Sequence, residues 1–407
     1  MDDNRVLPLN GVRVIELATI VAAPTASRIL CAYGAEVIKV EAPYGDELRR
    51  IGKTRGTPCS DENNPIFTVP NSNKKFVSIN FKIEEGKKAL LNLIATADIF
   101  ITNVREPSLK RNGLDYDTLK TTFPKLIYAH FSGYGPKGPA ASDPGFDNTA
   151  FWLRSGPLAD WQEEGAFPFL PTYAFGDMAT SSTLLSGVLI ALYAREKTGI
   201  GTKVETSLFA SGIWCNSIGV VTTQFAKKHL NPRQFYPTSP FDNYYLCADG
   251  KWIGIYVNEY TKDKIKFAKL LGMEDILEDP RYDSIASLNE SGVLPEAVSR
   301  INEVMMKQTS SEWRNIFSSN SISSEIMQST CDICRDEQAI ANAYVENVDF
   351  KDGLKVAMPC PPIFFSNYCR KEYSPTGVIG KDTESVLLDI GYTIGEISIM
   401  RKKGAIL

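Results

Sequence analysis

The sequence predicts an α/β protein with a Rossmann-like parallel-sheet large domain and a smaller α+β domain. Short apolar runs rich in β-branched residues alternate with helical segments from the N-terminus onward. This pattern is typical of a parallel sheet that is covered by helices on both faces. The pattern changes after about residue 231, where an Asp-Gly turn separates two strand-like segments. A chain of 407 residues is also long enough for more than one domain.

The N-terminal segments have the order strand, helix, strand. Gly11–Ala18 is a short apolar run and is predicted to be a buried strand. Pro24 suits the first helical position, so Thr25–Tyr33 is predicted to be a helix that ends at Gly34. Val37–Glu41 is predicted to be the next strand, and the crossover in such a unit is almost always right-handed.

The alternation of strands and helices continues to about residue 225. Further strands are predicted at Phe76–Phe81, Ile99–Asn103, Leu126–Phe131 and Val204–Thr206. Further helices are predicted at Glu84–Ala97, Tyr116–Phe123, Thr180–Arg195 and Leu208–Phe225.

The second part of the chain has a different pattern. Tyr244–Ala248 and Trp252–Val257 flank Asp249-Gly250, which predicts a β-hairpin. Helical segments follow to about residue 318, and Thr383–Ile390 is predicted to be a final helix. We therefore expect a large domain over residues 1–225, a small α+β domain over 231–320, and a C-terminal segment over 322–407 that returns to the large domain.

Composition and charge narrow the classes of function. The formal net charge of −4 weighs against a nucleic-acid or membrane binder, because both need a basic face. No apolar run approaches the roughly 20 residues of a spanning helix, and the acidic N-terminus lacks the apolar stretch of a signal peptide. We expect a cytoplasmic protein. Its eight cysteines lie mostly in apolar segments, which favours reduced, buried thiols.

Two short motifs resemble binding motifs, but structural roles are favoured for both. Gly133–Gly138 matches GxGxxG, but it follows a later strand and contains a proline, so a flexible loop beside a site is favoured over dinucleotide binding. Cys331 and Cys334 form a lone CxxC without a second ligand pair, which favours a structural role over metal or redox chemistry. We expect no metal site.

Catalysis is expected to depend on carboxylates, amides and backbone groups. Only His130 and His229 are histidines, and His130 lies in an apolar strand where a satisfied core histidine is the favoured interpretation. Asp177 follows Gly176, which permits close approach of a ligand, and it precedes a long apolar helix that favours an anion. The alternative is that Asp177 only caps this helix.

These residues and several further motifs resemble the class III CoA-transferases, the family of formyl-CoA transferase and carnitine CoA-transferase. The match runs nearly end to end and in order. It is carried by the Pro24 turn, Gly34–Glu41, Gly45-Asp46, Asn73–Lys75, Ala97-Asp98, Asn103, Arg111–Leu114, Ser132–Gly135, Pro144–Asp147, Gly176-Asp177, Lys197–Gly201, Ser207-Leu208 and Gly380–Thr383.

The resemblance implies that Asp177 is the nucleophilic aspartate of a CoA-transferase. Its carboxylate would attack an acyl-CoA thioester and give an acyl-aspartyl anhydride, and the CoA thiolate would then form an aspartyl-CoA thioester. Backbone amides of Gly133, Gly135 and Gly176 would steady the oxyanions. Coenzyme A would enter as a thioester substrate together with a carboxylic acid, and no tightly bound cofactor is expected.

The resemblance also implies a CoA groove along the loops after the early strands. Ala42 stands where the family often has an arginine, so Lys74, Lys75 or Arg49 is expected to hold a CoA phosphate instead, and Arg111 is the best-matched candidate. The alternative for Arg111 is a solvated arginine at a helix start. The residues expected to line the groove are Thr19, Ile20, Ala22, Lys74, Lys75, Ile79, Asn103, Val104, Arg111 and Asn112.

Two other functions stay open beside the transferase. An α-methylacyl-CoA racemase has a similar fold, but its family usually has a histidine where Phe146 stands, and a phenylalanine cannot move a proton. The other alternative is a non-catalytic CoA-binding protein, which the Gly176-Asp177 pair disfavours.

The substrate and the assembly are also inferred from the resemblance. The chain lacks the glycine-rich lid of the formyl-CoA transferases and has Phe235–Phe241 in that region. It looks most like the 2-hydroxyisocaproate and phenyllactate CoA-transferases of amino-acid fermentation, so a 2-hydroxy acid is expected. An apolar acid pocket is suggested by Phe151, Trp152, Trp161, Phe167, Phe169 and Tyr173, which otherwise serve as core or dimer contacts. Family members form interlocked homodimers, and we expect the same here.

Overall fold

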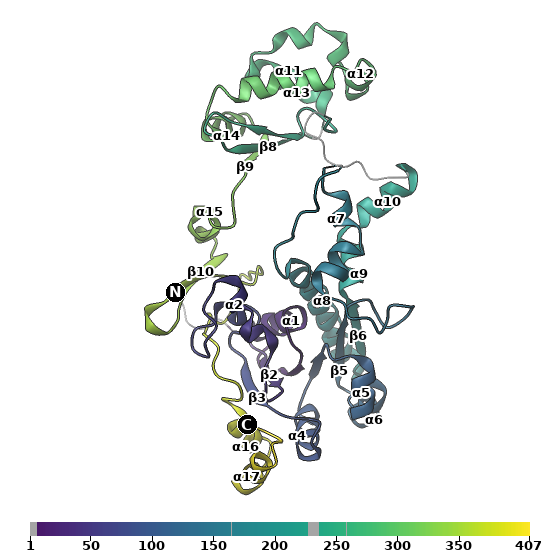
Figure 1. Ribbon diagram of the computed structural model, residues 1–407, viewed down its shortest axis with the longest axis vertical. Coiled ribbons are helices and arrows are strands. Elements are labelled where there is room, and N and C mark those ends of the chain that lie inside the picture. The colour runs from purple at the N-terminus through teal and green to yellow at the C-terminus, as the bar shows by residue number, and fades with distance from the viewer. Residues whose placement is uncertain (1–5, 164, 227–235, 258) are drawn as a thin grey trace. The chain divides into compact units, whose positions relative to one another are not determined.

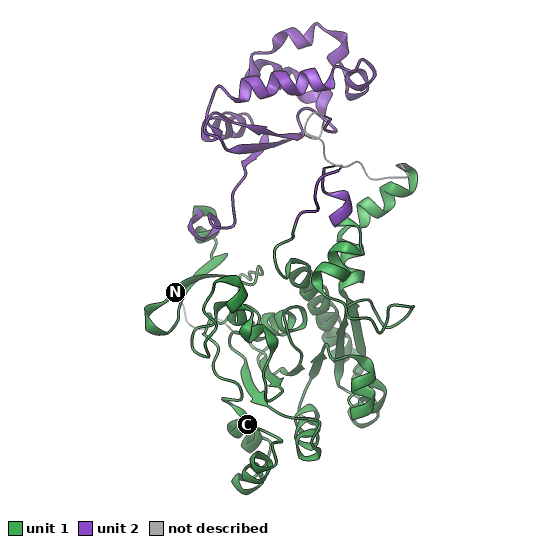
Figure 2. Ribbon diagram, viewed as in Figure 1, with its two compact units in different colours: residues 1–157, 170–226, 337–407 green, residues 158–169, 227–336 purple. Residues whose placement is uncertain are grey.

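The structure, a computed structural model, describes residues 6–163, 165–226, 236–257 and 259–407. The described chain divides into two compact units (Figures 1 and 2). Unit 1 comprises residues 1–157, 170–226 and 337–407, and unit 2 comprises residues 158–169 and 227–336. Each unit therefore contains segments that are distant in sequence.

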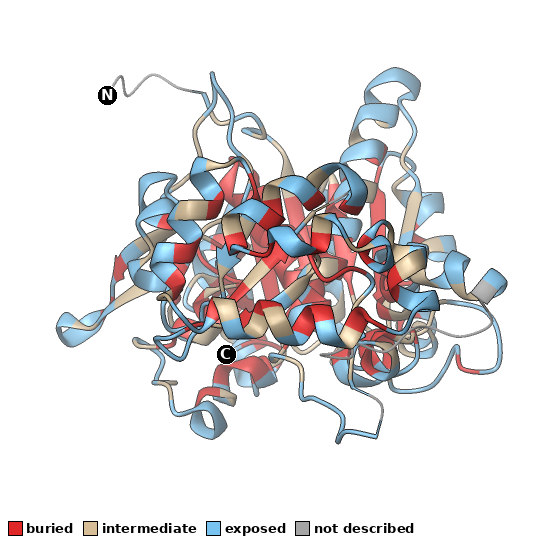
Figure 3. Cartoon of the chain, turned by 90° about the horizontal axis from the view of Figure 1, so that it is seen from above, coloured by how far each residue is buried: buried red, intermediate tan, exposed pale blue. Residues whose placement is uncertain are grey.

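Unit 1 is built on a six-stranded parallel sheet with the order β3-β2-β1-β4-β5-β6. The strands are β1 (Arg13–Leu17), β2 (Glu36–Glu41), β3 (Lys75–Ser78), β4 (Ile99–Thr102), β5 (Ile127–Ser132) and β6 (Lys203–Ser207). Most strand residues are buried (Figure 3), as the apolar runs predict for a sheet that is covered on both faces. The predicted α/β fold with a parallel sheet is confirmed, and its strand order is that of the doubly wound nucleotide-binding folds.

Helices and one hairpin complete unit 1. The helices are α1 (Ala22–Ala32), α2 (Gly52–Arg55), α3 (Pro65–Thr68), α4 (Glu84–Ala95), α5 (Glu106–Asn112), α6 (Tyr116–Thr122), α8 (Phe175–Thr198), α9 (Leu208–Cys215), α10 (Ser217–Ala226), α15 (Glu337–Ala341), α16 (Thr383–Asp389) and α17 (Ile394–Lys402). Short helical turns are η1 (Glu47–Arg50), η6 (Lys351–Gly353) and the π-helical η2 (Asp147–Leu153), while α7 (Pro157–Asp160) spans the boundary between the units. Strands β10 (Val345–Asp349) and β11 (Lys355–Pro359) pair antiparallel.

Several predicted helix boundaries are wrong for local reasons. Helix α1 begins at Ala22, so Pro24 is its third residue, where a missing N–H still costs nothing because the first turn has no intrahelical acceptors. Asn216 separates α9 from α10, where one helix was predicted. Helix α17 is also present after α16, so Thr383–Ile390 is not the final helix.

Helix α8 overturns the statement that no apolar run approaches a spanning length. Phe175–Thr198 is a 24-residue helix whose best window has a mean hydropathy of 1.3, and half of that window is buried inside the protein. Interspersed Gly, Ser and Thr residues hide this length from a search for apolar runs. The helix packs on α1 and β6 as part of the core of unit 1. A cytoplasmic location without membrane association stays a prediction.

Unit 2 combines a three-stranded antiparallel sheet with a group of helices. The strands β7 (Asn243–Leu246), β8 (Trp252–Tyr256) and β9 (Ser323–Ile326) pair in that order, and the predicted hairpin is confirmed. Gly250 adopts φ +74° in the turn, a conformation that glycine tolerates. The helical elements are α11 (Tyr260–Leu271), η3 (Glu274–Leu277), η4 (Pro280–Tyr282), α12 (Ile285–Glu290), α13 (Leu294–Met305), α14 (Ser310–Ser319) and η5 (Ile333–Arg335).

The core of unit 2 is aromatic. Phe241 stacks on Phe267 with ring centroids 4.2 Å apart, and Trp313 stacks on Phe317 at 5.5 Å.

The cysteines only partly follow the prediction of buried thiols. Cys31 and Cys247 are buried, but Cys215 is exposed, because an apolar neighbourhood in sequence does not fix which face of an element meets the core. Cys331 and Cys334 are also exposed and lie in a polar segment.

Candidate active site

Asp177 lies in the first turn of α8. Ala174 precedes the helix in the left-handed conformation, with φ +62°, and turns the chain so that α8 starts at Phe175. Asp177 is therefore the third helical residue, and the alternative that it is only the cap of a helix starting near Thr180 is wrong. Asp177 is 7% exposed, and its carboxylate has no hydrogen bond or ion pair among the described residues.

Asp147, at the start of η2, is a charged neighbour of Asp177. The backbone N–H of Asp177 donates to Oδ1 of Asp147 at 3.0 Å, and the N–H of Gly176 also points at this carboxylate. Gly176 has no room for a side chain, because a Cβ there would lie 2.3 Å from Oδ1 of Asp147 and 2.4 Å from Cγ of Phe151. Glycine thus lets the start of α8 approach η2 closely.

Both buried carboxylates have raised pKa values. Burial, together with the charge of Asp147, raises the pKa of Asp177 to about 7. Burial raises the pKa of Asp147 to about 6, although the two backbone amides partly offset that effect. Oδ2 of Asp147 is buried without a partner within the described chain. Such a pair of carboxylates with raised pKa values is typical of a reactive site.

An apolar cluster surrounds the turn that leads to Asp177. Ala174 packs with Val21, Leu48, Phe67 and Phe76, and the half-buried Ile20, Ile51, Ile66 and Tyr173 pack against this cluster. On the other side, the rings of Trp152 and Phe175 lie 5.6 Å apart. These apolar side chains lie beside the turn that leads to Asp177, which is itself buried, and an activated acyl group requires such a site with little water.

Thr19 and Asn103 meet where the strand order of the sheet reverses. They follow the carboxyl ends of β1 and β4, which are neighbours in the sheet. The N–H of Thr19 donates to Oδ1 of Asn103 at 3.1 Å, and Nδ2 of Asn103 donates to the carbonyl of Thr19 at 2.8 Å. Ligands of open α/β sheets bind at this switch point. Ile20, with φ +70°, donates its N–H to the carboxylate of Asp46 beside it.

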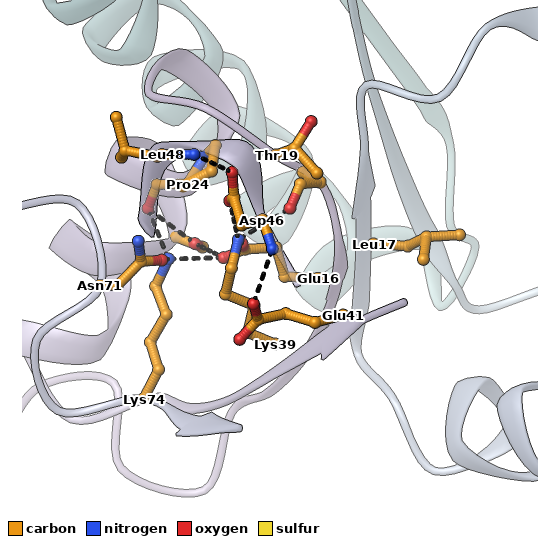
Figure 4. A network of polar contacts seen from close by, with 12 residues as sticks. Glu16, Leu17, Thr19, Pro24, Lys39, Glu41, Asp46, Leu48, Asn71 and Lys74 are labelled. Carbon is orange, nitrogen blue, oxygen red and sulfur yellow. Dashed lines mark hydrogen bonds and ion pairs between the residues drawn. The ribbon is translucent and has the colours of Figure 1, made fainter. Parts of the chain in front are cut away.

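A buried ion network lies below this loop (Figure 4). Lys39 contacts Glu16 at 2.8 Å and Asp46 at 3.0 Å, and Lys74 contacts Glu16 at 2.6 Å. Burial opposes the charge on Glu16, but the two ammonium groups outweigh this effect and lower its pKa to about 2. Glu41 holds the guanidinium of Arg49 at 2.6 Å in the same region.

This network corrects part of the predicted CoA groove. Nζ of Lys74 is buried and also donates to the carbonyl of Pro24 and to Oδ1 of Asn71, so it is not available to a CoA phosphate. Arg49 is buried against Glu41 for the same reason. Lys75 pairs with Glu36 at 2.5 Å where β3 and β2 begin, at the opposite end of the sheet from Thr19 and Asn103.

The other predicted groove residues differ in accessibility. Ala22 is 3% exposed and Ile79 is fully buried in the core, so neither offers surface to a ligand. Val104 is half-buried, and its carbonyl oxygen lies 3.1 Å from Nε2 of His130, which is a satisfied core histidine as predicted. Arg111 is exposed in the last turn of α5, not at a helix start, and Asn112 is the next residue of that turn.

The glycine loop has a structural explanation at two positions. A Cβ on Gly133 would lie 2.6 Å from Cα of Gly145, so the two backbones touch. The N–H of Gly135 donates to Oγ of Ser132 at 3.1 Å, and the N–H of Gly176 points at Asp147. The amides of Gly135 and Gly176 therefore already have acceptors in this structure, and their predicted oxyanion role stays a prediction.

Some predicted features lie elsewhere or outside the described residues. His229, Phe235 and the expected start of the small domain at residue 231 lie outside them. Of the candidate pocket aromatics, Phe151 and Trp152 are buried, whereas Phe167 is 92% exposed and Trp161 is 50% exposed. Across the described ranges, no group of three or more His, Cys, Asp or Glu side chains is placed to hold a metal ion.

Comparison with known proteins agrees with this geometry. The family model described as CoA-transferase family III matches residues 9–383. The chain belongs to CoA-transferase family III. The predicted enzyme class is thereby confirmed, and Asp147 is the site residue that the sequence analysis missed. The signal for Asp147 in the sequence is its place in the Gly145–Asp147 motif.

Two relatives of this family III CoA-transferase match it over nearly their whole length. The (R)-2-hydroxy-4-methylpentanoate CoA-transferase of Clostridioides difficile is 38% identical over 384 residues, which cover 94% of this chain and 96% of the relative. The cinnamoyl-CoA:phenyllactate CoA-transferase of Clostridium sporogenes is 37% identical over 406 residues, which cover 98% and 97%.

Solved structures agree on the fold of the CoA-transferase. The crystal structure of Rv3272 from Mycobacterium tuberculosis matches with a TM-score of 0.80 at 24% identity, covering 94% of this chain and 99% of that one. A CAIB/BAIF family protein from Brucella suis matches with a TM-score of 0.79 at 25% identity, covering 95% and 100%.

Proposed function

We propose that this CoA-transferase moves CoA from an acyl-CoA donor to a 2-hydroxy acid and that Asp177 carries the reaction intermediates. The observation that carries the proposal is the buried carboxylate of Asp177, which has no side-chain partner among the described residues and has a pKa raised to about 7. The names of the two bacterial relatives support a 2-hydroxy acid such as 2-hydroxy-4-methylpentanoate or phenyllactate. Such acids arise in amino-acid fermentation, which is the setting we propose.

The proposed reaction has two covalent intermediates. The ionised carboxylate of Asp177 attacks the thioester carbonyl, the C–S bond breaks, and an acyl-aspartyl anhydride and CoA thiolate result. The thiolate then attacks the aspartyl carbonyl, giving aspartyl-CoA and the donor acid. The acceptor carboxylate next displaces the thiolate to form a new anhydride. The thiolate finally attacks the new acyl carbon and restores the carboxylate of Asp177. No step needs a proton, so the scarcity of histidines is no obstacle.

The local structure supports the attack by Asp177. A desolvated carboxylate without hydrogen bonds is a stronger nucleophile than a hydrated one. The charge of Asp147 makes the ionised ground state of Asp177 less favourable, and this cost is relieved when acylation removes the charge. Asp147 also holds the N–H groups of the turn, which positions Asp177. Asp147 therefore acts as a positioning residue.

Trapping of the adduct tests this function. The protein is incubated with cinnamoyl-CoA or (R)-2-hydroxy-4-methylpentanoyl-CoA, treated with hydroxylamine or borohydride, and mapped by peptide mass spectrometry. We expect modification at Asp177 that is absent in Asp177→Asn and retained in Asp143→Asn, a change of an exposed aspartate in a nearby loop. An unmodified Asp177, together with α-proton exchange in deuterium oxide, would favour the racemase.

We propose that CoA lies along the switch point of the sheet. Thr19, Ile20, Asn103, Val104 and Asn112 come from the loops that follow β1 and β4 and from the end of α5. Arg111 is the candidate for a CoA phosphate, because its guanidinium is exposed and can bind a phosphate through two N–H groups.

We further propose the interlocked homodimer of the family. The predicted domains over residues 1–225, 231–320 and 322–407 need correction at two places, because residues 158–169 and 322–336, which include β9, belong to unit 2. Large apolar side chains on α8, α9 and α10 support an interface, since Ile190, Trp214, Ile218 and Phe225 are each at least 70% exposed. Light scattering is expected to give twice the chain mass of 45.0 kDa, and a monomer mass would contradict the proposal.

A further inference from the structure

The acid substrate brings a negative charge to a site that is already acidic. If the proposed transfer is correct, a carboxylate must approach the aspartyl carbonyl of residue 177 while Asp147 stays close by. An anion in such a poorly hydrated place needs a cation or several N–H donors to replace its water. The recognition of the acid therefore requires a positive group near the start of α8.

Most basic side chains of this region are already engaged. Lys39 and Lys74 are buried in the ion network with Glu16, and Arg49 is held by Glu41. Arg50 is exposed and donates to the carbonyl of Tyr44 at 3.0 Å. Lys39, Lys74 and Arg49 are therefore not free to take up a substrate carboxylate, and Arg50 has one of its donors engaged.

Arg55, the last residue of α2, is different. Its side chain is exposed, and within the described chain its guanidinium has no carboxylate or hydrogen-bond partner. The guanidinium carbon lies over the ring of Tyr173, 4.4 Å from the ring centroid. Stacking on an aromatic face fixes the plane of the group and leaves the N–H donors along its edge free.

Tyr173 connects Arg55 with the site. It stands four residues before Asp177, next to Ala174, whose left-handed conformation starts α8. Its ring packs against the same apolar cluster as Ile20, Ile51 and Ile66. Burial raises the pKa of Tyr173, and the charge of Asp177 raises it further while Arg55 lowers it, so both charges act on this ring.

We propose that Arg55 binds the carboxylate of the acid substrate, that Tyr173 holds the guanidinium in place, and that Ile51 and Ile66 face the side chain of the acid. This assignment rests on the proposed function. The planar fork of an arginine matches a carboxylate through two parallel hydrogen bonds. Half-buried isoleucines beside it suit a branched aliphatic or aromatic side chain better than a small polar acid such as oxalate.

Steady-state kinetics with separately varied acid and acyl-CoA test the proposal. Arg55→Gln is expected to raise KM for the acid by about tenfold to a hundredfold, the value of charge-assisted hydrogen bonds, and to leave KM for the acyl-CoA within about twofold. Arg55→Lys should recover part of the loss. Lys53→Gln removes an equal charge from the same exposed helix without the ring contact and should change neither constant.

Two further measurements keep the outcomes distinct. Tyr173→Phe keeps the ring and should behave nearly as wild type, whereas Tyr173→Leu should raise KM for the acid as Arg55→Gln does. Intact mass after reaction with acyl-CoA alone reports the Asp177 adduct. If wild type forms no adduct, the proposed function fails. If the adduct forms and Arg55→Gln has the same KM for the acid as Lys53→Gln, the role of Arg55 is overturned.

Discussion

The backbone N–H of Asp177 donates to Oδ1 of Asp147 at 3.0 Å, and this bond joins two buried aspartates that are 30 residues apart in sequence. The bond fixes the first turn of α8 against η2. It also brings a second negative charge close to Asp177, which contributes to the raised pKa of that group. The same contact therefore positions the proposed nucleophile and adds to the effect of burial on its pKa.

The pH dependence of adduct formation follows from this pair. Asp177 must be ionised to attack, so the single-turnover rate should fall as the pH is lowered through about 7. Asp147→Asn keeps an acceptor for the N–H and removes the charge, so the midpoint should move to lower pH. Stopped-flow or quenched mass measurements across pH 5–9 check this, with Asp143→Asn as the exposed control. An unchanged midpoint in Asp147→Asn would contradict the coupling.

The pH dependence of stability that Asp177 contributes should be opposite in sign to that of a salt-bridged aspartate. Its folded pKa, about 7, lies above the unfolded value, so the folded state holds the proton more tightly and stability falls as pH rises from about 4 to 7. Asp177→Asn removes this cost. We expect the free energy of unfolding to increase by on the order of 2 kcal/mol at pH 8 and to change little at pH 4. Thermal melts at both pH values measure it, and equal shifts at both would refute the linkage.

The buried network should be sensitive to the loss of one partner. Glu16→Gln leaves the ammonium group of Lys74 buried without a carboxylate, because Lys39 retains Asp46 but Lys74 does not. We expect a loss of about 3–5 kcal/mol in the free energy of unfolding. Glu36→Gln, which removes a partly exposed pair with Arg13 and Lys75, should cost less than about 1 kcal/mol. Urea denaturation compares the two variants.

Arg111 offers a test of the proposed CoA groove. Arg111→Gln is expected to raise KM for acyl-CoA about tenfold, with a smaller difference at high salt because a phosphate contact is screened. The neighbouring Lys110, whose Nζ lies 3.8 Å from Glu106, provides the control variant Lys110→Gln with little effect. Similar values of KM for the two variants would show that Arg111 does not bind CoA.

Gly176 should tolerate no side chain. In Gly176→Ala, the new Cβ would meet Oδ1 of Asp147 at 2.3 Å, so η2 and the turn before Asp177 must separate. A displacement near 1 Å at the nucleophile is expected to lower kcat about a hundredfold. Gly395→Ala in α17, where the nearest atom lies 3.9 Å from the added Cβ, should have wild-type activity. Full activity of Gly176→Ala would show that the contact does not position Asp177.

The sequence was informative wherever local pattern decides structure. Alternating apolar runs predicted the strands of the parallel sheet to within a few residues, because burial of a strand on both faces leaves a continuous apolar signal. Asp249-Gly250 predicted its hairpin through turn geometry alone. The motifs around Gly176-Asp177 indicated the family, which the full-length comparison confirmed.

The tertiary structure decided the environment of each charge. Lys74 and Arg111 are both basic residues in family motifs, yet one is buried against Glu16 and the other is exposed at the end of α5. Asp147 and Asp177 looked like two unrelated aspartates until the fold placed the carboxylate of one on the amide of the other. The sequence by itself thus determined the order of elements and the family. Burial and long-range pairing, which depend on contacts between distant segments, determined which of its charged residues can do chemistry.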